Sequence, residues 1–297
     1  MKKIVFYIPI FFSCLCYGQI DQYNHFPTMR PSHILDAKLT TISFALSFRV
    51  LESDYNGPLV RLRRSSDNAE QDFGWSDNDI VDVAAIDTWR SGSDVFVVIW
   101  YDQSGLGRNA IQNTNSFQPR FITDLTRPYF FGDGIDDRLD INTSIQVLTN
   151  AGINGSVFTI IYTTSKGQFS FGTRQPGVNR NRWSTHINWS NNNMYFDSGI
   201  CCDGVRSVAN TNNQWQQLSF IRANIVQTIR RSGTILRTGN YTNGPCTATN
   251  GFGILYTNGN NSQFATNRFT ELIMYQMDIS LSDIQEIENN QIDFWNL

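Results

Sequence analysis

The hydrophobic positions near the start of this chain follow a helical spacing. Residues 32–51, SHILDAKLTTISFALSFRVL, place apolar side chains three and four positions apart, and Ser32 is a typical helix N-cap. This spacing predicts one helix, which the breaker sequence DYNGP at residues 54–58 terminates. Residues 82–89, DVAAIDTW, predict a second and shorter helix.

Between and after these segments the pattern is typical of strands. Residues 59–66, LVRLRRSS, alternate apolar and basic side chains, as a half-buried strand does. Residues 94–101, DVFVVIWY, are almost continuously apolar, which predicts a fully buried strand. From about residue 119 onward, short runs rich in Phe, Ile, Tyr and Thr alternate with clusters of Gly, Asn, Asp and Ser. This rhythm predicts an all-β fold, an antiparallel β-sandwich with a few short helices.

One further helix is expected close to the end of the sequence. Residues 280–290, SLSDIQEIENN, contain Ser282 and Gln285 at the spacing of a capping box. Ile284 and Ile287 fall on one side of this helix, so we expect that side to pack against the sandwich.

The first eighteen residues indicate export. MKK is followed by the short apolar run IVFYIPIFFSCL and by the small-residue end CYG, which is the pattern of a secretory signal peptide cleaved near Gly18. The apolar run is too short to span a bilayer, and no longer one follows. We therefore expect a secreted protein, extracellular or periplasmic, whose residues 19–297 form a single domain with no membrane span.

Charge and missing motifs exclude several classes of function. Loss of Lys2 and Lys3 with the signal peptide changes the formal net charge from −3 to −5. Because phosphate backbones require clustered positive charge, this acidic balance argues against nucleic acid as the partner. The sequence contains no HExxH, CxxC or GxSxG motif, so it lacks the usual parts of zinc hydrolases and serine esterases.

Three cysteines remain after removal of the signal peptide: Cys201, Cys202 and Cys246. An odd number in an exported protein leaves one thiol outside any bond within the chain. Adjacent cysteines can close a strained eight-membered ring, but one of the pair can equally bond to Cys246. The residues themselves leave both pairings open.

Two blocks of the sequence resemble the catalytic domain of the α-L-arabinofuranosidase B family. They are YNGPLVRLRRSSDNAEQDFGW, Tyr55 to Trp75, and WYDQSGLGRNA, Trp100 to Ala110, and they support the resemblance over about residues 36–119. The resemblance implies a concanavalin A-like β-sandwich that removes terminal arabinofuranose from plant polysaccharides with retention. Residues 120–297, with FFGDGIDDRLDI and the terminal FTELIMYQMDISLSDIQEIENNQ, resemble the lectin/glucanase type of this fold in its laminin-G-type form.

A retaining glycosidase needs two carboxyl groups about 5 Å apart, one as nucleophile and one as acid/base. At the position of the family's acid this sequence has Asn260, whose amide cannot deliver a proton as a carboxylic acid does. The family's nucleophile is also unplaced, because no acidic residue lies between Asp203 and Glu271. Asp203 and Glu271 are therefore the catalytic candidates. The alternatives are a turn residue before Gly204 for Asp203 and an exposed strand position for Glu271.

The resemblance also indicates where a ligand binds. Its members carry a vicinal disulfide against the bound sugar, which implies a Cys201–Cys202 bond that forms an apolar platform. Trp189 and His186 lie in a polar, Asn-rich segment and can stack on a sugar ring, although packing in the core is the alternative for Trp189. The candidate ligand-binding residues are Cys201, Cys202, Trp189, His186, Asp197 and Asn260.

One cluster of carboxylates offers a metal site. Asp133, Asp136 and Asp137 lie together in GDGIDDRLD, and oxygen-rich clusters of this kind can hold Ca²⁺. A plain turn before a strand is the alternative, because the ligand spacing of a calcium loop is missing. Calcium is the one cofactor that the sequence suggests.

These observations predict a secreted carbohydrate-active protein that acts on arabinofuranosyl-decorated polysaccharide. A lectin-like module that binds glycan without cleaving it is one alternative. A surface adhesion or protein-interaction sandwich is another, because the same fold serves all three purposes.

Overall fold

The computed structural model describes residues 33–38, 40–164, 169–174, 182–199, 207–240, 244–257 and 264–297. Pro31–Leu297 form one compact unit. The predicted signal peptide, residues 1–18, lies outside the described residues.

Long antiparallel strands form the first layer of a sandwich. The strands of this layer are paired in the order β16, β15, β14, β9, β18 and β1. The members of this layer are β1 (Ile42–Ser47), β9 (Asn154–Tyr162), β14 (Trp215–Ala223), β15 (Val226–Arg231), β16 (Thr234–Asn240) and β18 (Arg268–Tyr275).

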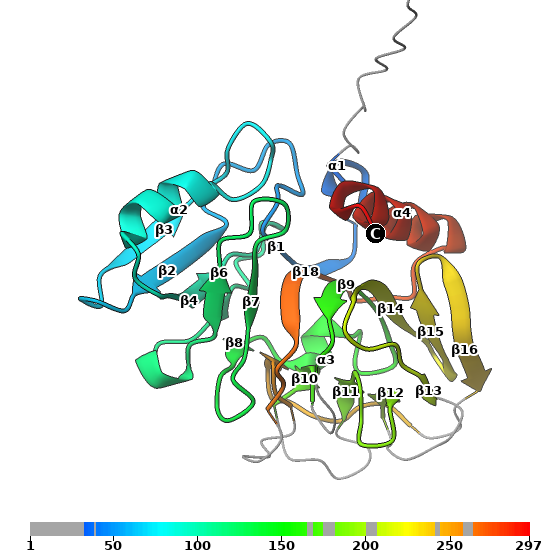
Figure 1. Ribbon diagram of the computed structural model, residues 1–297. Coiled ribbons are helices and arrows are strands. Elements are labelled where there is room, and N and C mark those ends of the chain that lie inside the picture. The colour runs from blue at the N-terminus through cyan, green and yellow to red at the C-terminus, as the bar shows by residue number, and fades with distance from the viewer. Residues whose placement is uncertain are drawn as a thin grey trace, which may run out of the picture. The chain divides into compact units, whose positions relative to one another are not determined.

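Shorter strands form the second layer, paired in the order β8, β17, β10, β11, β12 and β13. These strands are β8 (Leu139–Ile141), β10 (Phe171–Thr173), β11 (Trp183–His186), β12 (Asn193–Ser198), β13 (Ser207–Ala209) and β17 (Phe252–Ile254). In Figure 1 this layer lies below the first one, with β10 to β13 side by side.

A third group of strands links the two layers at one side. It consists of β2 (Val60–Arg64), β3 (Glu70–Phe73), β4 (Val95–Trp100), β5 (Ala110–Ile111), β6 (Arg120–Ile122) and β7 (Tyr129–Phe131). Strand β7 pairs with β18 of the first layer, and β5 pairs with β8 of the second. Helix α2 (Val83–Arg90) packs on this group through the ring contact between Trp89 and Phe73.

The main core fills the space between the layers. It is dominated by large side chains such as Trp100, Phe130, Phe171, Trp183 and Phe220, all fully buried. Because successive residues of a strand point to opposite faces, every second residue of each layer contributes to this core. The predicted all-β antiparallel sandwich is therefore confirmed.

A second, smaller core lies on the outer face of the first layer. Helix α4 (Leu281–Trp295) covers that face, as the red helix above β14 and β15 in Figure 1 shows, and buries Ile284 and Ile287 against it. The predicted apolar side of the helix is confirmed. Its cap is not the predicted one, since the Ser280 side chain accepts the N–H of Asp283 and thereby caps the helix two residues before Ser282.

The helix predicted over residues 32–51 is wrong for most of its length. Helix α1 contains only Leu35–Lys38, and Ile42–Ser47 form strand β1. All six residues of β1 are buried, because the main core lies on one face and the smaller core on the other. A strand buried on both faces loses the polar/apolar alternation, and its apolar run then matches a helical spacing by chance.

The other predicted elements have the predicted type. Residues 82–89 correspond to helix α2, residues 59–66 to strand β2, and residues 94–101 to strand β4. Two short helical segments, Ile145–Leu148 (α3) and the 3-10 turn Asn115–Phe117, connect strands. Among the described residues there is no helix of the length and hydrophobicity that crossing a membrane requires.

Candidate functional site

Strands β11 and β12 bring three of the predicted ligand-binding residues together. Ser184 pairs with Asp197 and His186 pairs with Tyr195, so His186 and Asp197 are diagonal neighbours on the same face of the hairpin. His186 Nε2 lies 3.0 Å from Asp197 Oδ2, and Arg182 Nη1 donates to the same oxygen at 2.9 Å. His186 and Asp197 are only 4% and 2% exposed, so this hydrogen-bonded group is fixed in place.

Aromatic rings surround His186. The Phe169 ring centroid lies 4.2 Å from that of His186, and the Trp189 ring lies 5.0 Å from it. Trp189 is half-buried, in the turn between the two strands, where its backbone N–H donates to the Asn193 carbonyl. An aromatic ring that is partly exposed beside hydrogen-bonding groups is a typical surface for a sugar, which has an apolar face and polar edges.

Four of the predicted site residues lie outside the described residues. They are Cys201, Cys202, Asp203 and Asn260. The Cys201–Cys202 bond, the apolar platform and the roles of Asp203 and Asn260 therefore stay predictions. In the sequence, Cys201 follows the end of β12 at Ser198 closely, so the same hairpin leads into this segment.

Glu271 on β18 has a different position from the one expected. It is 0% exposed, which corrects the exposed strand position considered from the sequence. Arg49 binds it through two hydrogen bonds, Nε to Oε2 at 2.7 Å and Nη2 to Oε1 at 3.0 Å. Ser47, Gln291 and Trp295 also donate to its carboxylate, so five hydrogen bonds hold both oxygens.

These contacts decide the charge of Glu271. Burial by itself raises the pKa of a carboxyl group, but the Arg49 guanidinium and the hydrogen bonds from Arg49, Trp295 and Gln291 outweigh it, so the pKa of Glu271 is lowered. A carboxylate that stays ionised and has no exposed oxygen is poorly suited to donate a proton to a glycosidic oxygen. The structure thus gives Glu271 a structural role beneath α4 and does not support its proposed catalytic one.

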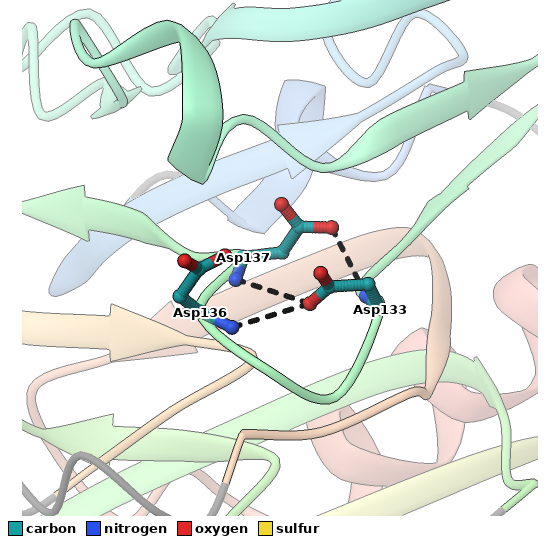
Figure 2. A group of neighbouring side chains, drawn as sticks. All are labelled: Asp133, Asp136 and Asp137. Carbon is teal, nitrogen blue, oxygen red and sulfur yellow. Dashed lines mark hydrogen bonds between the residues drawn. The ribbon is translucent and has the colours of Figure 1, made fainter.

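The three aspartates considered for calcium lie in one turn before β8. Figure 2 shows Asp133 Oδ1 accepting the backbone N–H groups of Asp136 and Asp137, at 3.2 and 3.4 Å, while Asp137 Oδ2 accepts the Asp133 N–H at 3.0 Å. The side-chain oxygens of the three residues lie within 4.8 Å of one another. These bonds form the turn that was the alternative to a metal site. Three carboxylates supply fewer than the roughly six to eight oxygens that Ca²⁺ takes, and calcium binding stays a prediction.

Asp137 has the most unusual carboxyl group of this turn. Burial, followed by the charge of Asp133, raises its pKa to about 7, although the hydrogen bond from the Asp133 N–H opposes the shift. Near neutral pH the turn therefore exchanges a proton, which makes it sensitive to pH.

Sequence reasoning missed two members of the site around His186. Arg182 lies two residues before Ser184 and four before His186. Because side chains of a strand alternate with a period of two, Arg182 lies on the same face as His186. That signal was available in RWSTH. Phe169 had no comparable signal, because only the pairing of β10 with β11 brings its neighbourhood to His186.

Comparisons with known proteins agree with this fold. Residues 31–121 match the model of the family described as alpha-L-arabinofuranosidase B, catalytic. The probable alpha-L-arabinofuranosidase B of Aspergillus fumigatus is 38% identical over 65 residues, which are 22% of this chain and 13% of that protein.

Solved structures extend the likeness to most of the chain. An arabinofuranosidase complexed with arabinofuranosyl-alpha-1,2-xylobiose has a TM-score of 0.73 at 16% identity, and an arabinofuranosidase of glycoside hydrolase family 54 soaked with a cyclic sulfate inhibitor has 0.71 at 15%. Each comparison covers 90% of this chain and 65% of the solved one, so this chain spans less than two thirds of those structures. At such identities the likeness shows the fold. The predicted resemblance to the catalytic-domain family of alpha-L-arabinofuranosidase B is therefore confirmed, with residues 31–121 carrying it in sequence and the sandwich carrying it in fold.

Proposed function

We propose that this protein is a carbohydrate-active protein of the α-L-arabinofuranosidase B type, which recognises arabinofuranosyl groups on polysaccharide. The observation that carries the proposal is the family match over residues 31–121 on a sandwich that superposes on arabinofuranosidases over 90% of the chain. We further propose that the protein is exported, with residues 1–18 as its signal peptide.

The ligand site that we propose lies at the β11–β12 hairpin. Trp189 offers an aromatic face to a sugar ring, and the partly exposed Arg182, which the buried Asp197 orients beside His186, offers hydrogen bonds at its edge. Cys201 and Cys202 follow β12 closely in the sequence, and the apolar platform expected of them is part of this proposal.

Binding without cleavage is the form of this function that the observations favour. One of the two catalytic candidates, Glu271, is buried and bound to Arg49. In addition, the position of the family's acid carries Asn260. Hydrolysis is the second candidate, favoured by the family match, and Asp203 is the sequence candidate that remains for one of its two carboxyl groups. Adhesion to another protein is the remaining alternative.

Retention of the purified protein in native gels that contain arabinan or arabinoxylan tests the proposal. Trp189→Ala is expected to weaken retention about tenfold, because an aromatic ring at the centre of an interface contributes a large share of the binding energy. Trp75→Ala serves as the matched control, since Trp75 is also half-buried but contacts Tyr55 in a different part of the fold.

Release of 4-nitrophenol from 4-nitrophenyl α-L-arabinofuranoside separates cleavage from binding. Retention without release supports a binding module, and release that is lost in Asp203→Asn supports the hydrolase. If neither retention nor release occurs, the proposed recognition of arabinofuranosyl groups is wrong.

A further inference from the structure

Two consecutive arginines at the end of β15 have opposite surroundings. Arg230 pairs with Ser219 and points to the outer face, where Glu288 of α4 binds it. Arg231 pairs with Leu218 and points to the other face. The alternation of a strand explains this difference, since neighbouring residues point to opposite sides.

The guanidinium of Arg231 is only partly used by the protein. Its Nη1 donates to Thr211 Oγ1 at 2.9 Å, but Nε and Nη2 are buried and have no hydrogen-bond partner within the described part of the chain. No carboxylate among the described residues forms an ion pair with Arg231, and burial lowers its pKa. A buried guanidinium without an anion is costly, which distinguishes this residue from its neighbour.

The unpartnered edge of Arg231 is the edge by which other arginines of this protein bind carboxylates. In four pairs Nε and Nη2 donate to the two oxygens of one acidic side chain, at distances between 2.6 and 3.0 Å. Two parallel hydrogen bonds of this kind hold a carboxylate more strongly and in a more defined orientation than a single hydrogen bond does. The four pairs are Arg49 with Glu271, Arg61 with Asp72, Arg64 with Asp67, and Arg230 with Glu288.

Two further buried acceptors belong to the same hydrogen-bonded group of residues. Gln216, which is 2% exposed, donates from Nε2 to Thr163 Oγ1 at 3.3 Å, and Asn210 donates from Nδ2 to the same hydroxyl at 3.4 Å. These bonds orient both amides, and they leave Gln216 Oε1 and Asn210 Oδ1 buried and unpartnered among the described residues. Gln216 and Arg231 both bond to Thr211, so the groups form one cluster.

This Arg231 cluster, made of Thr163, Asn210, Thr211, Gln216 and Arg231, adjoins the turn that carries Trp189. The backbone N–H of Asn210 donates to the carbonyl of Asn192 at 2.8 Å, and the N–H of Asn192 donates to the carbonyl of Trp189 at 2.8 Å. Arg231 is itself partly exposed, although its Nε and Nη2 atoms are buried. A ligand that extends from Trp189 toward Arg231 must therefore displace the atoms that cover them.

We propose that the Arg231 cluster binds a carboxylate that is flanked by hydroxyl groups, namely a uronic acid residue of a polysaccharide. The Nε and Nη2 groups of Arg231 donate to the carboxylate, and the two amide oxygens accept hydrogen bonds from the hydroxyls of the ring. The carboxylate and its hydroxyl neighbours follow from the cluster itself. Their assignment to a polysaccharide rests on the proposed function.

Isothermal titration of the purified protein with sodium glucuronate, sodium galacturonate and a short oligogalacturonide tests this site. Arg231→Gln is expected to weaken binding roughly 10- to 100-fold, the usual effect of losing hydrogen bonds to a charged group. Arg231→Lys keeps the charge but removes the paired donors, and it is expected to weaken binding as well. Arg120→Gln is the matched control: it removes the same charge from an exposed pair with Asp94 and is expected to bind like the parent.

Folding and ligand chemistry are checked in the same experiment. Arg231→Gln should melt no lower than the parent, because no carboxylate loses its partner and an unpaired buried guanidinium is removed. Arg231→Lys remains informative if the first variant does not fold. Sodium acetate, sodium sulfate and glucose are titrated in the same way as reference ligands. Tighter binding of the uronates than of all three supports the proposal, and equal or tighter binding of sulfate or acetate overturns the uronic acid assignment.

The outcomes separate this site from the proposed function. Uronate binding that depends on Arg231 supports the site even if arabinan is not retained, in which case only the proposed function fails. Retention of arabinan together with uronate binding that is absent, or unchanged in Arg231→Gln, overturns the site and leaves the proposed function standing.

Discussion

Replacement of Glu271 by Gln tests whether this residue is structural or catalytic. The substitution keeps the shape of the side chain but removes its charge, and it leaves the Arg49 guanidinium buried without an anion. It also places the NH₂ group of glutamine opposite donors that face a carboxylate oxygen in the parent protein, among them the Trp295 indole at 2.9 Å. The damage is therefore to the packing of α4 and β1 on β18.

The expected loss of stability follows from the burial of the pair. Arg49 and Glu271 are 1% and 0% exposed, so solvent screens neither charge. Removal of one partner of such a pair costs about 3–5 kcal/mol in the free energy of unfolding. For a unit of this size, about 2–4 °C per kcal/mol converts this to a melting temperature roughly 6–20 °C lower.

Thermal melting by circular dichroism measures this effect, with Arg49→Met/Glu271→Leu as the matched control. The double variant removes both charges, so it is expected to be more stable than Glu271→Gln alone. The same samples are assayed for arabinan retention and for release of 4-nitrophenol below the melting transition. A Glu271→Gln variant that melts like the parent but has lost release would refute the structural role and return Glu271 to catalysis.

Acid should reduce the difference between parent and variant. Because the folded protein lowers the pKa of Glu271, its ionised form stabilises the fold above the usual value of 4.5, and this stabilisation is lost as the pH falls through the folded pKa. The parent should therefore approach the Glu271→Gln variant in stability only in acid. A difference that stays constant down to the lowest pH at which both fold would contradict the lowered pKa.

Two further predictions concern other buried groups. Because the pKa of Asp137 is raised to about 7, its ionisation opposes folding increasingly as the pH rises from about 4 to 7, so Asp137→Asn should stabilise the protein at pH 8 and have little effect at pH 4. Urea titrations at both pH values measure this, and equal effects at the two would contradict it. Burial raises the pKa of the Cys246 thiol to about 11, so this cysteine should resist iodoacetamide in the folded protein, while peptide mass spectrometry finds Cys201 bonded to Cys202. A Cys202–Cys246 bond would show the vicinal pairing to be wrong.

The relation between the two arginines of β15 illustrates how tertiary structure assigns roles. In the sequence Arg230 and Arg231 are equivalent neighbours in TIRRSG. Only the position of α4, which brings Glu288 to Arg230, makes the first an ion-pair member and leaves the second with an unpartnered edge. A residue 58 positions away decides the difference.

Local pattern was sufficient for most of the elements and for part of the site. The alternation in β2, the apolar run of β4 and the spacing of α4 are properties of a few consecutive residues, and each predicted the right type of element. His186 and Asp197 are only 11 residues apart on adjacent strands, so a hairpin was enough to bring them together. The resemblance to arabinofuranosidases also needed only two short blocks of sequence.

The sequence by itself determined the sandwich, its terminal helix and the neighbourhood of Trp189, because periodicity and short-range pairing are local. Tertiary structure alone decided that Ile42–Ser47 form a strand buried on both faces, and that Glu271 forms an ion pair with Arg49, which is 222 residues away in the sequence. Burial on two faces removes the alternation by which a strand is recognised. A charge pair between residues that are distant in the sequence leaves no periodic trace, because each partner satisfies the other only after the chain has folded.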